Sequence, residues 1–388
     1  MSRKLSRITA LLPAALAASL MGVLFAACGG GGTTGTTANT KKPPAVSNLG
    51  LWIANGTNVL EYVPSQLSAG GTGAPAPHLM LNSAVFGAPQ GVTFDGAGNL
   101  WVMDPSGKVN GATTPALFEF SAAQLAALAA NPAPEPIATI TSTSLNFPQQ
   151  SVFDAQGNQW VSDHNNNTVL VFTASQLAMA GINAVNPAVV ITSAAFNGPL
   201  GIVFDGAGNL YVANNGGVPG ANGATSAVGT TIVEFAANQL PTPPSTGMLT
   251  PDLAPFATLS DDGNGSVQGP WALIFDAHGN LWSSNANTPF TLVEFGKATL
   301  GASGAPTPAV TISPTMDGGN ATLNAPNGIC FDNVGDLAAM NSAGAFGIAF
   351  FGSNQLTNSG ATVPSTFIVG ATTTLNAPAG CNFGTLVN

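Results

Sequence analysis

From about residue 48 onward the chain consists mostly of short hydrophobic runs separated by Gly, Asn, Asp and Pro. Many runs alternate between apolar and polar positions and are rich in Val, Ile, Thr and Phe, which predicts β-strands. One run recurs six times, from a proline to a phenylalanine followed by Asp or Gly: PQGVTFD (89–95), PQQSVFD (148–154), PLGIVFD (199–205), PWALIFD (270–276), PNGICFD (326–332) and PAGCNFG (378–384). A unit that returns this often predicts a repeat architecture.

Each unit predicts four strands, and the copy that begins at Pro89 shows the pattern. Its first strand is followed by a turn GAGN (96–99), a second strand LWVMD (100–104), a third strand ALFEF (116–120), a helical turn ending in AQL (123–125) and a fourth strand PIATIT (136–141). Asp, Asn and Gly suit the tight turn, because the carboxylate accepts bonds from backbone N–H groups and Gly tolerates positive φ. The repeated Phe and Trp positions are expected to form the core.

Six units of four antiparallel strands predict an all-β fold, a six-bladed β-propeller. The first unit starts at LWIAN (51–55) and lacks its inner strand, whereas the last unit contains only that strand, 378–384. We therefore expect the N-terminal strands to pair with the C-terminal inner strand and close the ring, which protects the sheet edges. An open solenoid of β units is the alternative fold, but it does not explain the split repeat.

The first residues have a different character and predict export. Arg3, Lys4 and Arg7 precede an apolar run at 8–27. The end of this run and the cysteine that follows it, Cys28, read LFAAC. A basic flank, an apolar stretch and small residues are typical of a signal peptide. The run resembles a bacterial lipoprotein signal, although Phe25 stands where that family usually has Leu; the resemblance implies that Cys28 becomes lipidated. Ordinary signal cleavage and an uncleaved anchor are the alternatives.

These features predict a signal peptide at 1–27, a flexible Gly- and Thr-rich tether at 28–47 and the propeller at 48–388. Gly29, rather than aspartate, follows the cysteine, which favours the outer membrane of the bacterial envelope over the inner one. Within 48–388 the cations are Lys108 and Lys297, against seventeen acids, so the net charge is −15. A body this acidic repels nucleic acid and anionic lipid headgroups. We expect no nucleic-acid partner and membrane contact only through Cys28.

The repeat P-x-G-I-x-x-D, its Gly-Asn turn, a second strand ending in Asp or Asn and a third strand ending in Phe resemble the NHL repeat. The resemblance covers the chain from about Asn48 to its end, and it implies a propeller that could serve as a binding module or as an enzyme. Gluconolactonase-like propellers place a carboxylate at the start of an inner strand to hold a divalent ion. The matching positions here carry none: Gln90, Gln149, Leu200, Trp271, Asn327 and Ala379.

The positions of the three histidines can be compared with those in two further families of propeller enzymes. Amidating-lyase propellers use a histidine-bound zinc, but His78, His164 and His278 are expected in an outer strand, a loop and a turn, where they cannot converge. Streptogramin-lyase-like propellers use a histidine near the channel mouth as an acid or base. His164 is the candidate for this role, because it is expected at a suitable height near the channel mouth. Asp163 beside it could orient it. The alternative is an exposed histidine in a turn.

An Asp or Asn stands at the end of every second strand, where a loop toward one mouth of the channel begins: Asn55, Asp104, Asp163, Asn214, Asn285 and Asn341. The six residues could cap a turn that repeats with the blade. Alternatively, with His164, they could line a polar surface for a glycan or a protein loop. No cofactor is predicted. The alternative is a divalent cation held by Asp104 and Asp163.

Cys330 and Cys381 lie in inner strands of neighbouring units, and export to an oxidising compartment favours a disulfide between them. Alternatively, both are small residues that fill the interface. For function, the sequence favours a lipid-anchored envelope propeller that acts as a non-catalytic binding or scaffolding module for a protein or glycan. The alternative is an envelope lyase or hydrolase with its site at the mouth lined by Asp and Asn, using His164 or a bound ion.

Overall fold

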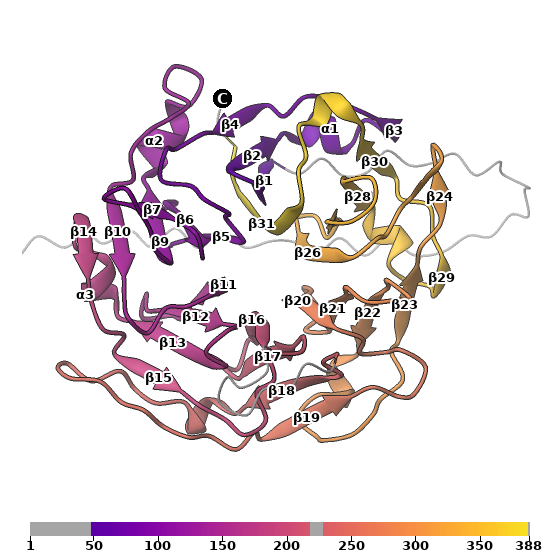
Figure 1. Ribbon diagram of the computed structural model, residues 1–388. Helices are drawn as coiled ribbons and strands as arrows, with labels where there is room; N and C mark the ends of the chain where they lie inside the picture. Colours follow the sequence, from indigo (N-terminus) through magenta and orange to yellow (C-terminus); the bar gives the residue numbers. More distant parts are fainter. Residues whose placement is uncertain (1–47, 218–227, 387–388) are drawn as a thin grey trace, which may run out of the picture. The chain divides into compact units, whose positions relative to one another are not determined.

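The computed structural model describes residues 48–217 and 228–386 and shows six small antiparallel sheets arranged as blades in a ring (Figure 1). The predicted six-bladed β-propeller is therefore confirmed. The predicted signal peptide and tether, with Cys28, and part of the insertion at 214–231 lie outside the described residues. Within the described part of the chain, no helix has the length and apolar character needed to cross a membrane.

The strands of each blade are given from the inner strand outward. Blade 1 contains β31 (Pro378–Thr385), β1 (Leu49–Asn55), β2 (Asn58–Tyr62) and β4 (Leu79–Leu81). Blade 2 contains β5 (Gly91–Phe94), β6 (Leu100–Asp104), β9 (Ala116–Phe120) and β10 (Ala138–Thr141). Blade 3 contains β11 (Pro148–Phe153), β12 (Gln159–Asp163), β13 (Thr168–Phe172) and β15 (Val189–Ile191).

Blade 4 contains β16 (Pro199–Phe204), β17 (Leu210–Asn214), β18 (Thr231–Phe235) and β19 (Ala257–Ser260). Blade 5 contains β20 (Pro270–Phe275), β21 (Leu281–Asn285), β22 (Leu292–Phe295) and β23 (Val310–Ser313). Blade 6 contains β26 (Pro326–Phe331), β27 (Leu337–Asn341), β28 (Gly347–Phe351) and β30 (Thr366–Val369). Two hairpins, β7 (Lys108–Val109) with β8 (Ala112–Thr113) and β24 (Met316–Asp317) with β25 (Asn320–Ala321), lie outside the blades.

The ring closes as the split repeat predicts, because β31 pairs antiparallel with β1 from the other end of the chain. Three blades also carry a fifth, parallel strand that the four-strand prediction lacked. The connection between the third and fourth strands of one blade runs along the outer edge of the preceding blade, as β14 (Gly181–Ala184) on β10, β29 (Gly360–Ala361) on β23 and β3 (Gly71–Gly73) on β30. These strands satisfy backbone groups that the outer edges would otherwise expose.

The predicted helical turn follows each third strand: α1 (Pro64–Leu67), α2 (Ala122–Ala126), α3 (Ala174–Leu177), η1 (Ala237–Gln239), η2 (Lys297–Thr299) and η3 (Ser353–Gln355), with η4 (Ala371–Thr373) elsewhere. Its glutamine explains the recurring Gln-Leu pair. In α3, the Gln176 Oε1 accepts the Thr173 N–H at 2.9 Å, and its Nε2 donates to the Asn186 carbonyl at 2.7 Å. The glutamine side chain thus connects the start of the helical turn to the segment that leads into the fourth strand.

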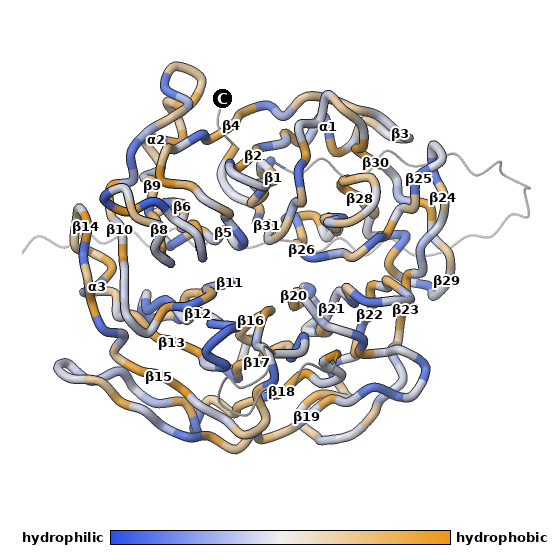
Figure 2. The backbone as a smooth tube through the Cα atoms, in the orientation of Figure 1, coloured by the Kyte–Doolittle hydropathy of each residue, from blue (hydrophilic) through white to orange (hydrophobic). Residues whose placement is uncertain are grey.

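Aromatic pairs join neighbouring blades. The aromatic residue of a second strand packs edge-on against the inner-strand phenylalanine of the next blade, with ring centroids 5.2–6.4 Å apart: Trp52–Phe94, Trp101–Phe153, Trp160–Phe204, Tyr211–Phe275 and Trp282–Phe331. Hydrophobic stretches accordingly recur in every blade, interrupted by hydrophilic ones (Figure 2). Such pairs contribute about 0.5–1.5 kcal/mol each beyond the burial of their area. The prediction that these aromatics form the core is confirmed for the buried Trp and Tyr residues of the second strands, whereas their phenylalanine partners on the inner strands are only partly buried.

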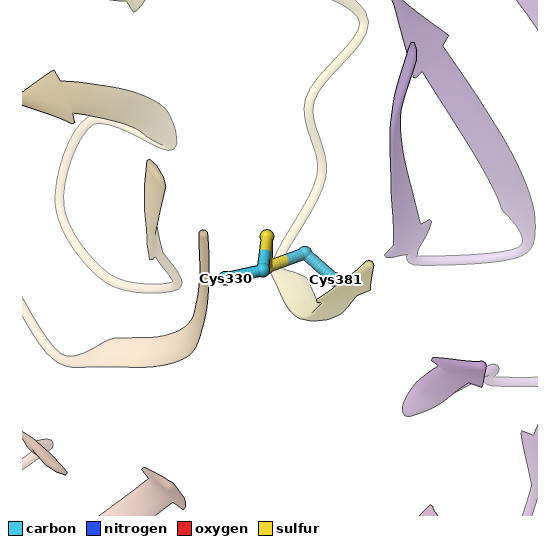
Figure 3. Close-up of a disulfide and its surroundings, with 2 residues drawn as sticks. All are labelled: Cys330 and Cys381. Atoms are coloured by element: carbon cyan, nitrogen blue, oxygen red, sulfur yellow. A yellow bond between two sulfur atoms is a disulfide. The ribbon is translucent and has the colours of Figure 1, made fainter. Parts of the chain in front are cut away.

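The interface between blades 6 and 1 differs from the other five, because Ala338 occupies the aromatic position of β27. At this interface a disulfide joins Cys330 of β26 to Cys381 of β31, with Cα atoms 6.1 Å apart (Figure 3). The predicted pairing is therefore present, and it connects the inner strands where the ring closes.

Candidate functional site

The antiparallel order of the strands gives the ring two faces. We call the side with the tight turns after the inner strands the turn face. The opposite side, with the loops that follow the second strands, is the loop face. The sequence placed its candidate site on the loop face.

The six Asp and Asn residues on the loop face are all buried, at 0–1% exposure. In blade 2, the Asp104 carboxylate accepts backbone N–H groups from Gly87 at 2.7 Å, Ala88 at 3.0 Å and Ser106 at 2.8 Å. The asparagines make the equivalent bond: Asn214 accepts from Asn197 N–H at 3.0 Å, and its amide donates to the Ala195 carbonyl at 2.8 Å. Each side chain ties the end of its second strand to the loop before the inner strand of the same blade.

This arrangement favours the capping interpretation over the polar binding surface. Because the six side chains are covered and engaged by backbone groups, a ligand at this mouth would contact the loops that they hold rather than the side chains themselves. Burial raises the pKa of Asp163 to about 6, while N–H groups of Phe147 and Asn146 act in the opposite direction. Among residues 48–217 and 228–386, no three His, Cys, Asp or Glu side chains are grouped so that they could hold a metal ion.

His164 is half-buried and forms part of the contact between blades 3 and 4. Its Nε2 lies 3.1 Å from the Gly216 carbonyl, and its Nδ1 lies 3.0 Å from Asn165 Oδ1. The neighbouring Asp163 carboxylate instead accepts N–H groups of Asn146 at 2.9 Å and Phe147 at 2.6 Å, and the amide of Asn166 at 3.0 Å. The hypothesis that Asp163 orients His164 is not supported by these bonds, because the carboxylate is engaged by the preceding loop.

A cavity of about 1020 Å³ lies on the turn face, between blades 3 and 4. Its walls are the turns at 154–158 and 205–208 and the segment 240–247, which includes Pro241, Pro243 and Pro244. Sequence reasoning did not find this site. The available signal was the proline-rich insertion that lengthens the fourth repeat and that covers one side of the cavity.

A second cavity of about 640 Å³ lies between blades 4 and 5 on the same face. Tyr211, Glu234, His278 and Lys297 contribute to its lining, and Asp205, Gly206 and Ala207 line both cavities. The turn after β16 thus forms a ridge with a hollow on each side. By contrast, the central channel, lined by inner strands of all six blades, holds only about 150 Å³, less than the roughly 300–1,000 Å³ of typical ligand pockets.

The turns that frame the cavities are rigidly built. In blade 3, Asp154 Oδ1 accepts the N–H groups of Gln156 at 3.0 Å and Asn158 at 2.9 Å, and Oδ2 accepts the Asn158 amide at 2.8 Å and the Trp160 indole N–H at 2.9 Å. Asp205 is held in the same way by Ala207 and Asn209. The two carboxylates in the larger cavity are therefore fixed by their own turns, and none of the described residues that line it is Lys, Arg or His.

Comparison with known proteins defines the class of fold only. No family model matches the chain, and no curated protein matches it. Among solved structures, a putative 6-phosphogluconolactonase from Bacteroides fragilis is similar over 89% of this chain and 99% of its own, with a TM-score of 0.51 and 13% identity. A chain of a nidogen–laminin complex is similar over 88% and 99%, with a TM-score of 0.49 and 12% identity.

A streptogramin B lyase is similar over 69% of this chain and 66% of its own, with a TM-score of 0.37 and 14% identity. At 13% identity, the similarity to the putative 6-phosphogluconolactonase shows a shared fold alone.

Proposed function

We propose that the protein is a lipid-anchored propeller of the bacterial envelope, with NHL-like repeats, that acts as a non-catalytic binding module for a protein or glycan. The observation that carries the proposal is the cavity of about 1020 Å³ between blades 3 and 4. Its size suits a ligand, and the rigid blades that hold it need no rearrangement to present it.

The lining of this cavity favours binding over catalysis. Its acidic groups, Asp154 and Asp205, accept N–H groups of their own turns, so each carboxylate already serves as a turn cap. A general base must reach a proton of the substrate at hydrogen-bond distance. The exposed side chains of the lining, such as Gln156, Ser245 and Thr246, instead offer amide and hydroxyl groups for recognition.

The anchor is tested by labelling cells with an alkyne analogue of palmitate and comparing the wild type with Cys28→Ser. We expect the wild-type protein to carry the label and to partition into the membrane fraction until detergent is added. The Cys28→Ser variant should carry no label, because serine cannot form the thioether that a lipoprotein anchor requires. An unlabelled wild-type protein would overturn the proposed anchor while leaving the binding site untouched.

The non-catalytic role is tested with His164→Ala and with analysis of each bound probe by mass spectrometry. We expect probes to be recovered unchanged, and His164→Ala to bind them as the wild type does, because His164 lies on the face opposite the cavity. Probe turnover that is lost in His164→Ala would instead establish the lyase or hydrolase alternative at the loop face.

A further inference from the structure

We propose that the two cavities on the turn face form one track, crossing the ridge at Asp205–Gly208, that binds an extended basic peptide segment of a partner protein. This inference rests on the proposed binding function and assigns its ligand class. Three features support it: the continuity of the cavities, their charge and the nature of their lining.

Continuity follows from the shared residues. Asp205, Gly206 and Ala207 line both the cavity between blades 3 and 4 and the cavity between blades 4 and 5. Gly206 on this ridge is exposed, and a Cβ added there would meet no atom within 4 Å. A chain lying in one hollow can therefore pass over the ridge into the other. Together the two volumes, about 1020 and 640 Å³, exceed what a small ligand would fill.

The acidic residues around the two cavities favour a basic ligand. Among the residues that the structure describes, Asp154 and Asp205 line the larger cavity without a basic side chain, and Glu234 and Asp276 line the smaller one together with Lys297 and His278. The carboxylates are engaged by N–H groups, yet they remain part of a body with a net charge of −15. A field of this sign draws lysine and arginine toward the track and repels phosphate groups. The negative charge of the track therefore disfavours a phosphorylated sugar as the ligand.

The lining offers apolar surface to the stems of basic side chains. Trp160, the tryptophan of the larger cavity, is only 3% exposed. Partly exposed Phe204, Leu240 and Pro241 offer apolar surface instead. The aliphatic stem of a lysine or arginine can lie on such surface while its charged end remains in water.

The chain supplies a matched pair of variants for the test. Residues 94–100 in blade 2 and 204–210 in blade 4 have the same sequence, FDGAGNL. Gly96 and Gly206 occupy the same place in these two turns, neither has a positive φ, and neither has atoms within 4 Å of an added Cβ. Gly206→Trp places a bulky group on the ridge between the cavities, whereas Gly96→Trp places it where neither cavity lies.

The experiment measures fluorescence anisotropy with the detergent-solubilised full chain and labelled peptides of alternating lysine and alanine, ten or four residues long. We expect the decamer to bind at least about tenfold more tightly than the tetramer, because it engages both cavities at once. Gly206→Trp should remove this advantage, while Gly96→Trp should leave it intact. Equal thermal midpoints of the two variants would show that Gly206→Trp acts through the track and not through folding.

Other outcomes overturn the inference in distinguishable ways. Lysine-peptide binding that is equal in both variants would show nonspecific attraction to the acidic body and would exclude the track. Cellohexaose binding that only Gly206→Trp weakens would replace the peptide by a neutral glycan and leave the proposed binding function standing. Binding of the matching glutamate–alanine decamer would refute the charge argument. Cleavage of any probe would overturn the non-catalytic function itself.

Discussion

Asp336→Asn is expected to stabilise the protein by about 1–2 kcal/mol at pH 8 and to make its stability less dependent on pH. The reason lies in the tight turns of the turn face. In four of them an asparagine amide donates to the Oδ2 of the turn aspartate at 2.8–3.0 Å, from Asn99, Asn158, Asn209 and Asn280. In blade 6 the corresponding residue is Asp336, whose side chain has no N–H group to donate.

The backbone of this turn matches the others. Asp332 Oδ1 accepts the N–H groups of Val334 at 3.0 Å and Asp336 at 2.9 Å, and Asp336 Oδ1 accepts the Ser353 N–H at 2.7 Å. The second oxygen of Asp336 therefore stands where the asparagine nitrogen stands in the other blades. Within the described part of the chain, the buried Oδ2 of Asp332 has no hydrogen-bond partner. Two carboxyl groups thus face each other, with Asp332 8% and Asp336 3% exposed.

Burial raises the pKa of both groups, and the charge of Asp336 raises that of Asp332 further, although backbone N–H groups lower it. The folded protein consequently binds protons more tightly than the unfolded chain, whose carboxyl pKa is near 4. The slope of the unfolding free energy with pH is then negative, so stability falls as pH rises from about 4 through the raised values. A proton shared by the pair restores the missing hydrogen bond at low pH, and its loss leaves two buried charges.

Urea unfolding of the wild type and Asp336→Asn at pH values from 5 to 8 checks this expectation. The difference between the two proteins should grow with pH, because asparagine donates its hydrogen bond at every pH. Asn158→Asp is the reciprocal control: it introduces the same pair in blade 3, so it should destabilise the protein and steepen its pH dependence. Parallel curves for the wild type and Asp336→Asn would refute the shared proton. Glu119 and Asp163, whose pKa values burial raises to about 7 and about 6, contribute the same slope to every variant.

Removal of the disulfide with Cys330→Ser and Cys381→Ser is expected to lower the unfolding free energy by about 2–4 kcal/mol. The bond closes a loop with a sequence separation of 51, for which loop entropy alone predicts about 4 kcal/mol. It lies at the interface where Ala338 stands in place of the aromatic residue that other blades use. The same interface lies beside the β31–β1 pairing that closes the ring, so a weaker contact there loosens the closure itself.

The midpoint of urea unfolding, measured with and without dithiothreitol, separates the bond from the substitutions. Reductant should lower the midpoint of the wild type and leave that of the double serine variant unchanged. A double alanine variant distinguishes loss of the bond from burial of two hydroxyl groups, and it should resemble the double serine variant. An unchanged midpoint after complete reduction, verified by thiol titration, would show that the disulfide adds nothing to ring closure.

Most of the fold could be predicted from the sequence because the information is local and repeated. Alternation within strands, turn residues after each Phe-Asp and six copies in phase define a blade and its number, and the split repeat defines the closure. The placement of Cys330 and Cys381 in adjacent inner strands, together with the predicted export, made their pairing a specific hypothesis. The candidate site was harder, since Asp and Asn at a strand end suit capping and ligand binding equally until burial is known.

Tertiary structure alone decided which of these roles applies, and it did so through contacts between residues distant in sequence. Asp163 meets the loop before its inner strand, so it caps that loop and does not hold His164. The fifth strands and both cavities depend on how the connections of one blade lie along the neighbouring blade, which no pattern within a single repeat encodes. Local periodicity determined the blade, whereas packing between blades determined which surfaces remain open to a ligand.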